Sequence, residues 1–266
     1  MNNILDLDSA SRIMGNNAED YNSQSAHSPL HRKCSILAFF DFAAAFPSVV
    51  HDWICLVWEM RGFPVGIRYL FACIYFLNSA HASEGESLTF LFWYLSGVLQ
   101  GCPASAFVFD VCLDPFLVAF EKVVADKGRG IIRACADDLG AALEHYKTFK
   151  YMYTVFEDAE KLAGLTLKPV KCIVVPTSEP FSEHIVNVIT KWLCQNIPKW
   201  ANFNLKSIGK YLCFYMRPDA ASKQWIDPLS KFMMKCRDIG RCCAPASISV
   251  IFSTPMQFQF FCTRLS

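Results

Sequence analysis

The stretch GIIRACADDLGAAL, residues 130–143, decides the fold of this 266-residue chain. Two apolar runs enclose an adjacent pair of acids, Asp137 and Asp138. Asp is common in tight turns because its side chain can hydrogen-bond to the neighbouring backbone. The pattern therefore predicts two antiparallel strands joined by a turn, with both carboxylates at the tip. A plain surface turn and a metal-binding corner both fit this pair, and the rest of the chain has to distinguish them.

A third acid lies in another apolar run. CSILAFFDFAAAF, residues 34–46, is typical of a buried strand and contains Asp41 as its single acid. Burying a carboxylate is costly unless a partner or a metal ion compensates its charge. The three acids have no obvious basic partners in the sequence, which indicates that they share cations. Hard divalent cations prefer carboxylate oxygens, and two such ions about 3.5–4 Å apart can catalyse phosphoryl transfer.

Helical and extended patterns are mixed along the chain, which predicts the α+β class. The expected helices are 2–14, 49–60, 65–77, the stretch after Pro103, 146–163 and a basic tail. The expected extended segments are 34–46, 86–95, the hairpin around Asp137, two short strands flanking 168–171 and a hairpin over 211–216. Residues 15–28 are rich in Asn and Ser, and we expect them to form a loop.

The composition excludes a disordered chain, because 53% of the residues are hydrophobic. The longest uninterrupted apolar stretches, such as 69–77 and 88–94, are shorter than the roughly 20 residues that span a bilayer. The N-terminus carries Asp and Asn instead of the apolar core of a secretory signal. We therefore expect an intracellular protein of the nucleus or cytoplasm, without a transmembrane segment. A peripheral membrane protein is a further interpretation, which rests on hydrophobicity alone.

Cysteine usage points to a reducing compartment. The chain has 13 cysteines, and none form a C-x-x-C pair. Most lie inside apolar runs, as Cys55, Cys73, Cys112 and Cys194 do. We therefore expect buried free thiols and no zinc site.

The charge of the chain is unevenly distributed. From Lys199 onward there are ten Lys and Arg against three acids, so this part carries +7 and residues 1–198 carry −6. A protein that binds a phosphate backbone at one end and cations in the middle has this distribution. An ordinary solvated face would give the same pattern.

Five motifs in a fixed order resemble the palm of reverse transcriptases, most closely those of non-LTR retrotransposons. They are FFDFAAAFPSV (39–49), SGVLQGCPAS (96–105), ACADDL (134–139), AGLTLKPVKC (163–172) and KYLCFYM (210–216). The second is similar to the Gly-Val-x-Gln-Gly-x-Pro-x-Ser motif of the family, and the third to its aromatic-Ala-Asp-Asp motif. Any one of them is weak evidence, whereas five in order over about 34–216 are specific.

The resemblance implies a metal site. Asp41, Asp137 and Asp138 would hold two Mg²⁺ ions, with the Phe42 carbonyl as a further ligand and Mn²⁺ as an alternative metal. Lys171 would lie near the leaving pyrophosphate as a general acid. The competing interpretation of Lys171 is a solvated lysine.

The resemblance also implies a nucleotide site. The backbone amides near Ala44 and Ala45 would face the incoming triphosphate, and Phe46 would lie under the sugar and exclude a 2′-hydroxyl. Gln100 and Gly101 would contact the nucleotide and the template. Phe46 could equally be a plain core residue.

By the same resemblance, the chain divides into a remnant of the fingers with a polar loop (1–33), a palm (34–205), and a primer-grip-like hairpin with a partial thumb (206–266). The palm would be an antiparallel sheet backed by helices. The implied partners are an RNA template, a DNA primer and deoxynucleoside triphosphates, with no membrane, and the oligomeric state is left open.

The sequence also departs from the family pattern. Cys135 stands where an aromatic residue usually precedes Ala-Asp-Asp, and only 33 residues precede Cys34, where the family has a full fingers region. These departures keep a second interpretation open, a non-catalytic retroelement remnant that at most binds nucleic acid through its basic tail.

Overall fold

The computed structural model describes residues 2–24, 32–75, 78–85, 87–99, 101–217 and 224–241. Its centre is a five-stranded sheet with the order β4-β5-β1-β6-β7. The strands are β1 (Ile36–Phe40), β4 (Gly130–Cys135), β5 (Asp138–Leu143), β6 (Ile173–Pro176) and β7 (Asn204–Leu205). All neighbours pair antiparallel except β6 and β7, which are parallel. The expected α+β class and antiparallel sheet are confirmed.

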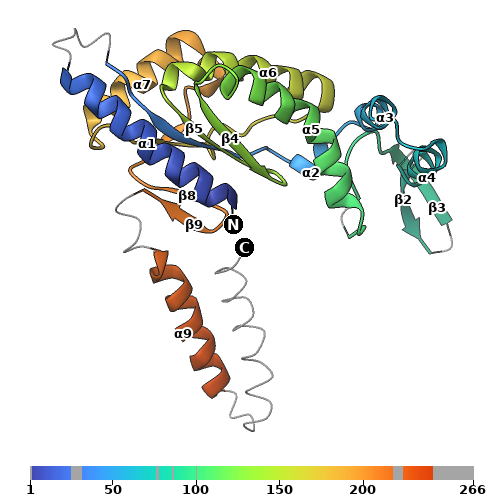
Figure 1. Cartoon of the computed structure of the whole chain (residues 1–266). Helices are drawn as coiled ribbons and strands as arrows, with labels where there is room; N and C mark the ends of the chain where they lie inside the picture. Colours follow the sequence, from blue (N-terminus) through green and yellow to red (C-terminus); the bar gives the residue numbers. More distant parts are fainter. Residues whose placement is uncertain are drawn as a thin grey trace.

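Both faces of this sheet are covered, because alternate side chains of a strand point to opposite faces. On β1, Ile36, Ala38 and Phe40 belong to the larger core, whereas Leu37 and Phe39 belong to a smaller one. The larger core is backed by α5 (Ser105–Val124), α6 (Phe149–Ala163) and α7 (Glu183–Asn196). Figure 1 shows α1 (Asn2–Gln24) lying across the opposite face, beside the hairpin of β8 (Gly209–Tyr211) and β9 (Phe214–Met216).

The smaller core joins α1 and the β8–β9 hairpin to the sheet. Leu7 and Tyr211 are almost fully buried there. Both pack over Gly140 of β5, where an added Cβ would lie 2.7 Å from the end of the Leu7 side chain and 3.2 Å from the Tyr211 ring. The glycine thus allows a helix and a hairpin to approach the sheet backbone closely.

A smaller lobe connects β1 to α5. It contains α2 (Ala45–Ser48), α3 (His51–Met60), α4 (Val65–Tyr75) and the hairpin of β2 (Ser79–Glu84) and β3 (Ser87–Trp93). In Figure 1 its outer part, α4 with β2 and β3, lies to one side of the main sheet. Trp58 of α3 is buried against Phe63 and Phe71, and this aromatic cluster holds α3 and α4 together.

Most of the expected elements are present. The helices expected over 49–60, over 65–77 and after Pro103 are α3, α4 and α5. The helix α6 ends at Gly164, whose φ of 75° is the left-handed conformation expected at a helix C-terminus. The strand expected over 86–95 is β3, and the tail contains α9 (Ile226–Arg241). No helix within the described ranges is both long enough and apolar enough to cross a membrane.

Two expectations about the elements are wrong in part. The loop expected from residue 15 is helical as far as Gln24, because Gly15 and Ala18 continue the buried face of α1, and residues 25–28 lie outside the described part. Of the two strands expected around 168–171, only β6 forms. On the other side Leu167 makes a single bridge to Phe42.

The described cysteines are free thiols, as predicted, but most of them are not buried. The ten cysteines of the described segments are free thiols, but only Cys34, Cys112 and Cys172 are buried. Cys73 and Cys194 are exposed because α4 and α7 each have an outer face, and an apolar run in the sequence does not show which face a residue takes.

Candidate functional site

The tip of the β4–β5 hairpin presents two acids. Cys135 and Asp138 are the last paired residues, so Ala136 and Asp137 form the turn. Ala136 has a φ of 51°, in the left-handed region that disfavours a residue with a Cβ. Asp137 and Asp138 are both exposed. The predicted hairpin with carboxylates at its tip is therefore confirmed.

Asp41 lies at the same edge of the sheet. Phe40 pairs with Leu139 in the β1–β5 register, so the next residue along β1, Asp41, comes opposite Asp138. The pKa of the Asp138 carboxyl is raised above its ordinary value. The first cause is the loss of surrounding water, and the charges of Asp137 and then Asp41 add to it. The fold thus gathers like charges that favour a shared cation.

Lys171, in the loop before β6, lies next to Asp41. Its Nζ lies 3.4 Å from Oδ1 of Asp41, and both side chains are about half exposed. The loop is fixed because the Lys168 N–H donates to the Asp41 carbonyl and the Lys171 N–H donates to the Lys168 carbonyl. Lys171 is therefore an exposed ion-pair partner of Asp41, and its role as a general acid stays a prediction.

The direction of the Phe42 carbonyl follows from the hydrogen bonds of its neighbours. On one side of Phe42 in the chain the Asp41 carbonyl accepts a hydrogen bond from the Lys168 N–H, and on the other the Ala43 N–H donates to the Thr166 carbonyl. These two backbone groups therefore point toward residues 166–168. Backbone groups of successive residues in an extended chain point to opposite sides. The Phe42 carbonyl therefore points away from Thr166 and Lys168, toward the side of β5 and Asp138.

The segment after Asp41 forms the short helix α2. Ala44 is exposed at its N-terminal boundary and Ala45 is its first residue, so their N–H groups lie at the end of the helix where intrahelical partners are lacking. Phe46 is half-buried and stacks on Phe109 of α5, with ring centroids 4.6 Å apart. Phe46 is thus a packed residue, and part of its side chain stays exposed.

The SGVLQGCPAS segment lies alongside this loop. The Val98 N–H donates to the Phe46 carbonyl and the Gly97 N–H to the Val49 carbonyl, each at 2.8 Å. Gly101 has a φ of 91° and open space where a Cβ would be. Gln100 lies outside the described residues. The structure therefore brings the first two motifs together, as their proposed roles require.

Two residues of the site were missed by sequence reasoning. Tyr211 of β8 donates its O–H to the carbonyls of Arg133 and Asp138, at 3.3 and 3.4 Å. It ties the β8–β9 hairpin to both strands just behind the acidic tip. The buried Cys172 thiol lies 3.9 Å from the Asp41 carbonyl, and burial raises its pKa to about 12. Only the KYLCFYM motif pointed to the first, and no sequence signal pointed to the second.

The side chains at this site are of the type that binds divalent cations, because they carry carboxylate oxygens. Within the part of the chain that the structure describes, no three Asp, Glu, His or Cys side chains lie close enough together to hold a metal ion. Asp41 and Asp138 nevertheless offer carboxylate oxygens from facing strand ends, and burial together with the charges of Asp137 and Asp41 raises the pKa of Asp138. Lys171 places a positive charge beside Asp41.

The chain is similar to known proteins. The family model "Reverse transcriptase (RNA-dependent DNA polymerase)" matches residues 3–201. Among solved structures, the apo telomerase of Candida tropicalis, truncated from the C-terminal domain, is 13% identical, with a TM-score of 0.43 over 64% of this chain and 35% of that chain. The Candida albicans telomerase with a telomeric RNA fragment is 12% identical, with a TM-score of 0.43 over 67% and 37%. The chain thus spans about a third of these two structures. No curated protein matches it.

Proposed function

Because the chain belongs to the reverse transcriptase (RNA-dependent DNA polymerase) family, we propose that it adds deoxynucleotides to a primer 3′-hydroxyl along an RNA template. The observation that carries this proposal is the meeting of Asp41 and Asp138 at facing strand ends, with Lys171 at 3.4 Å from Asp41. The order of the five motifs supports a non-LTR retrotransposon origin.

Asp41, Asp137 and Asp138, with the Phe42 carbonyl, would hold two Mg²⁺ ions, or Mn²⁺ in their place. When bound, these ions activate the attacking hydroxyl and stabilise charge on the phosphates. The hairpin and the β1 end position the carboxylates, and Tyr211 fixes the hairpin from behind. Rigid support of this kind keeps the carboxylates correctly spaced.

The remaining residues would bind and orient the nucleotide. N–H groups at Ala44 and Ala45 would face the triphosphate, and the exposed part of the Phe46 ring would lie under the sugar. The stacking of Phe46 on Phe109 supports this role, because a ring fixed by packing can exclude a 2′-hydroxyl sterically. The open space at Gly101 would admit the template backbone, with Gln100 beside it.

Lys171 would act on the leaving group. Its ammonium is held beside Asp41 in the chain as it stands. With the Asp41 carboxylate engaged by a divalent cation, the Lys171 ammonium would be available to donate a proton to the leaving pyrophosphate. This makes Lys171 a general-acid candidate whose position depends on the occupancy of the acids.

We also propose the division into residues 1–33, 34–205 and 206–266 as remnant fingers, palm, and primer-grip hairpin with partial thumb. The family match to residues 3–201 supports the central part. Residues 2–24 pack on the sheet as α1, so they are structurally part of the same unit as the palm.

Two observations favour a second function. Lys171 already neutralises Asp41, and no three metal-ligating side chains gather in the described ranges. A remnant that binds nucleic acid without catalysis would show these features. In that case the basic C-terminal part would be expected to supply the affinity.

Primer extension on an RNA template distinguishes the two functions. With a labelled DNA primer, Mg²⁺ and deoxynucleotides, the polymerase proposal predicts template-dependent extension, and ribonucleotides should be incorporated poorly. Binding of the primer–template that weakens steeply with salt, without any extension, would favour the remnant.

A further inference from the structure

A basic cavity lies at the end of the sheet opposite to the acids. The cavity measures about 500 Å³ and is lined by Arg32, Arg129, Lys147 and Lys150, with Glu144 as the acid in its wall. Arg32 precedes β1 and Glu144 follows β5, whereas Asp41 follows β1 and Asp138 begins β5. The length of these strands, about 20 Å, therefore separates the basic cavity from the candidate active site.

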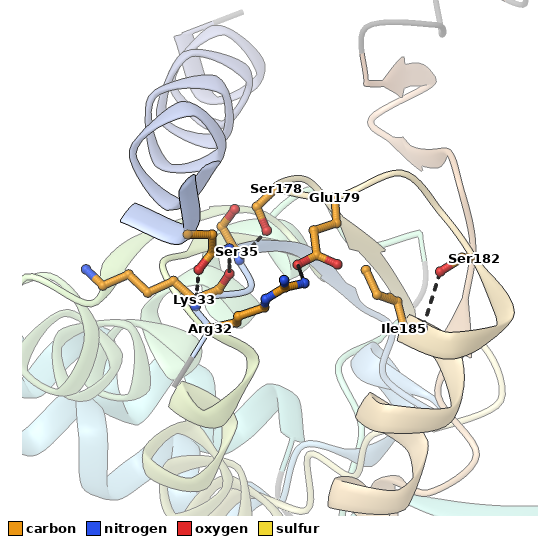
Figure 2. Close-up of polar contacts among 8 residues, drawn as sticks. Arg32, Lys33, Ser35, Ser178, Glu179, Ser182 and Ile185 are labelled. Carbon is orange, nitrogen blue, oxygen red and sulfur yellow. Dashed lines mark hydrogen bonds and ion pairs between the residues drawn. The ribbon is translucent and has the colours of Figure 1, made fainter. Parts of the chain in front are cut away.

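The positive charge of this cavity is largely uncompensated. Arg32 pairs with Glu179 at 4.0 Å (Figure 2). Lys147 and Lys150 are exposed, and among the described residues neither has a carboxylate partner within 4 Å. Four cations thus line a wall that contains one carboxylate, and such a concave cationic surface concentrates anions.

The part of the cavity wall before β1 is held by hydrogen bonds and an ion pair. Figure 2 shows how the chain before β1 is held: the Ser35 N–H donates to the Ser178 hydroxyl, and Arg32 reaches Glu179. The Lys33 backbone exchanges two hydrogen bonds with the Asn22 side chain. These contacts hold Arg32 and the backbone next to it at the edge of the cavity.

His145 connects the two sides of the wall. Its Nδ1 accepts from the Lys147 N–H at 3.1 Å, and its ring bonds to the Arg32 backbone. Burial first, and then the charge of Lys147, lower its pKa to about 4. His145 is therefore neutral near pH 7, and it fixes the wall without adding charge to it.

Two aromatic rings complete the lining. The Arg129 guanidinium lies 3.7 Å above the Tyr151 ring, in a cation–π contact that orients its charge. Trp192 is half-buried and packs edge to face on Tyr146. Cations that bind phosphates beside flat rings that stack on bases are the combination found in single-strand binding surfaces.

We propose that this cavity binds a single-stranded nucleic acid, with phosphates on Arg129, Lys147 and Lys150 and a base against Trp192. The site is separate from the candidate active site and does not depend on catalysis. It would hold a strand that enters or leaves the protein on the far side of the sheet.

Binding of a fluorescent oligothymidylate of about 12 nucleotides to the whole chain tests this proposal. The variant Lys147→Gln/Lys150→Gln removes two exposed cations without touching the contacts of Arg129. The control Lys122→Gln/Lys161→Gln removes two exposed lysines that do not line the cavity. Thermal denaturation verifies that both variants fold.

The cavity variant should bind several-fold more weakly, and its plot of log affinity against log salt should be shallower by about 1.4, since each phosphate contact contributes about 0.7. The control should match the parent chain. Equal losses in both variants would overturn the proposal. It would also be overturned if adenosine monophosphate or inorganic phosphate displaced the oligonucleotide as well as an unlabelled strand does, because the cavity would then be a site for small phosphates.

Discussion

The replacement Asp138→Asn should make the folded protein more stable. Asp138 lies opposite Asp41 and next to Asp137, and its pKa is raised first by burial and then by these two charges. An acid whose pKa is raised on folding binds its proton more tightly in the folded state. Its destabilising effect is therefore present above the folded pKa and vanishes below the ordinary value of 3.8. Asn keeps the shape of the side chain and removes the charge.

The magnitude follows from Coulomb's law. Two carboxylates about 6 Å apart in a medium as polar as water repel by about 0.7 kcal/mol. The exposure of both side chains justifies the high dielectric constant, and Lys171 offsets part of the charge of Asp41. With the contribution of Asp137, we expect a gain of about 0.5–1 kcal/mol at pH 7.5. For a chain of this size this corresponds to a melting temperature higher by about 1–4 °C.

Urea denaturation in the absence of divalent metal measures this difference. The matched control is Asp158→Asn, an exposed aspartate on α6, which should change the unfolding free energy by less than about 0.5 kcal/mol. The gain for Asp138→Asn should shrink as the pH is lowered toward 4. A variant that is less stable than the parent at pH 7.5, or a gain that persists unchanged at low pH, would refute the electrostatic reasoning.

Three further predictions concern the metal, the packing of the β8–β9 hairpin and the basic cavity. About 10 mM Mg²⁺ should raise the unfolding free energy by about 1.4 kcal/mol for a dissociation constant near 1 mM, and Asp41→Asn should abolish this rise in urea denaturation. Gly209→Ala should lower the unfolding free energy by about 1–3 kcal/mol in urea denaturation, because the new Cβ would overlap the Phe39 ring. The stability contributed by neutral His145 should be complete above about pH 6.5 and fall by about 2 kcal/mol toward pH 4. In His145→Asn, which retains an acceptor for the Lys147 N–H, the urea midpoint should depend less on pH over this range.

The core of the fold could be read from the sequence because strand patterning and turn chemistry are local. The run before Asp41 and the two runs around Asp137 predicted the central strands. The opposition of Asp41 and Asp138, however, is a matter of register between strands about 100 residues apart. Nothing within either strand determines it.

The full length of α1 depended on tertiary contacts and could not be predicted from local patterns. The extension of α1 past Gly15 is stabilised by packing on the sheet, which outweighs the loop preference of its Asn and Ser residues. The helix α7 was not predicted, although Ser182 caps it and Ile185, Ile189 and Leu193 recur at helical spacing. The cap and the apolar period together were a usable signal.

The site was predicted in part. The resemblance predicted Lys171 near the leaving pyrophosphate as a general acid, which stays a prediction, and the structure places its Nζ 3.4 Å from Asp41. The sequence pointed to Tyr211 only through the KYLCFYM motif, because a hydrogen bond from its O–H to backbone carbonyl groups carries no sequence signature.

The central claim is that the acids at the ends of β1 and the β4–β5 hairpin catalyse nucleotidyl transfer. Single-turnover incorporation of one deoxynucleotide on an RNA template with a DNA primer, measured side by side for the parent chain, Asp138→Asn and Asp158→Asn, tests it most directly. We predict incorporation by the parent and by Asp158→Asn, and a rate at least about 100-fold lower for Asp138→Asn. Incorporation by Asp138→Asn at the parent rate, or none by the parent in either Mg²⁺ or Mn²⁺, would contradict the claim.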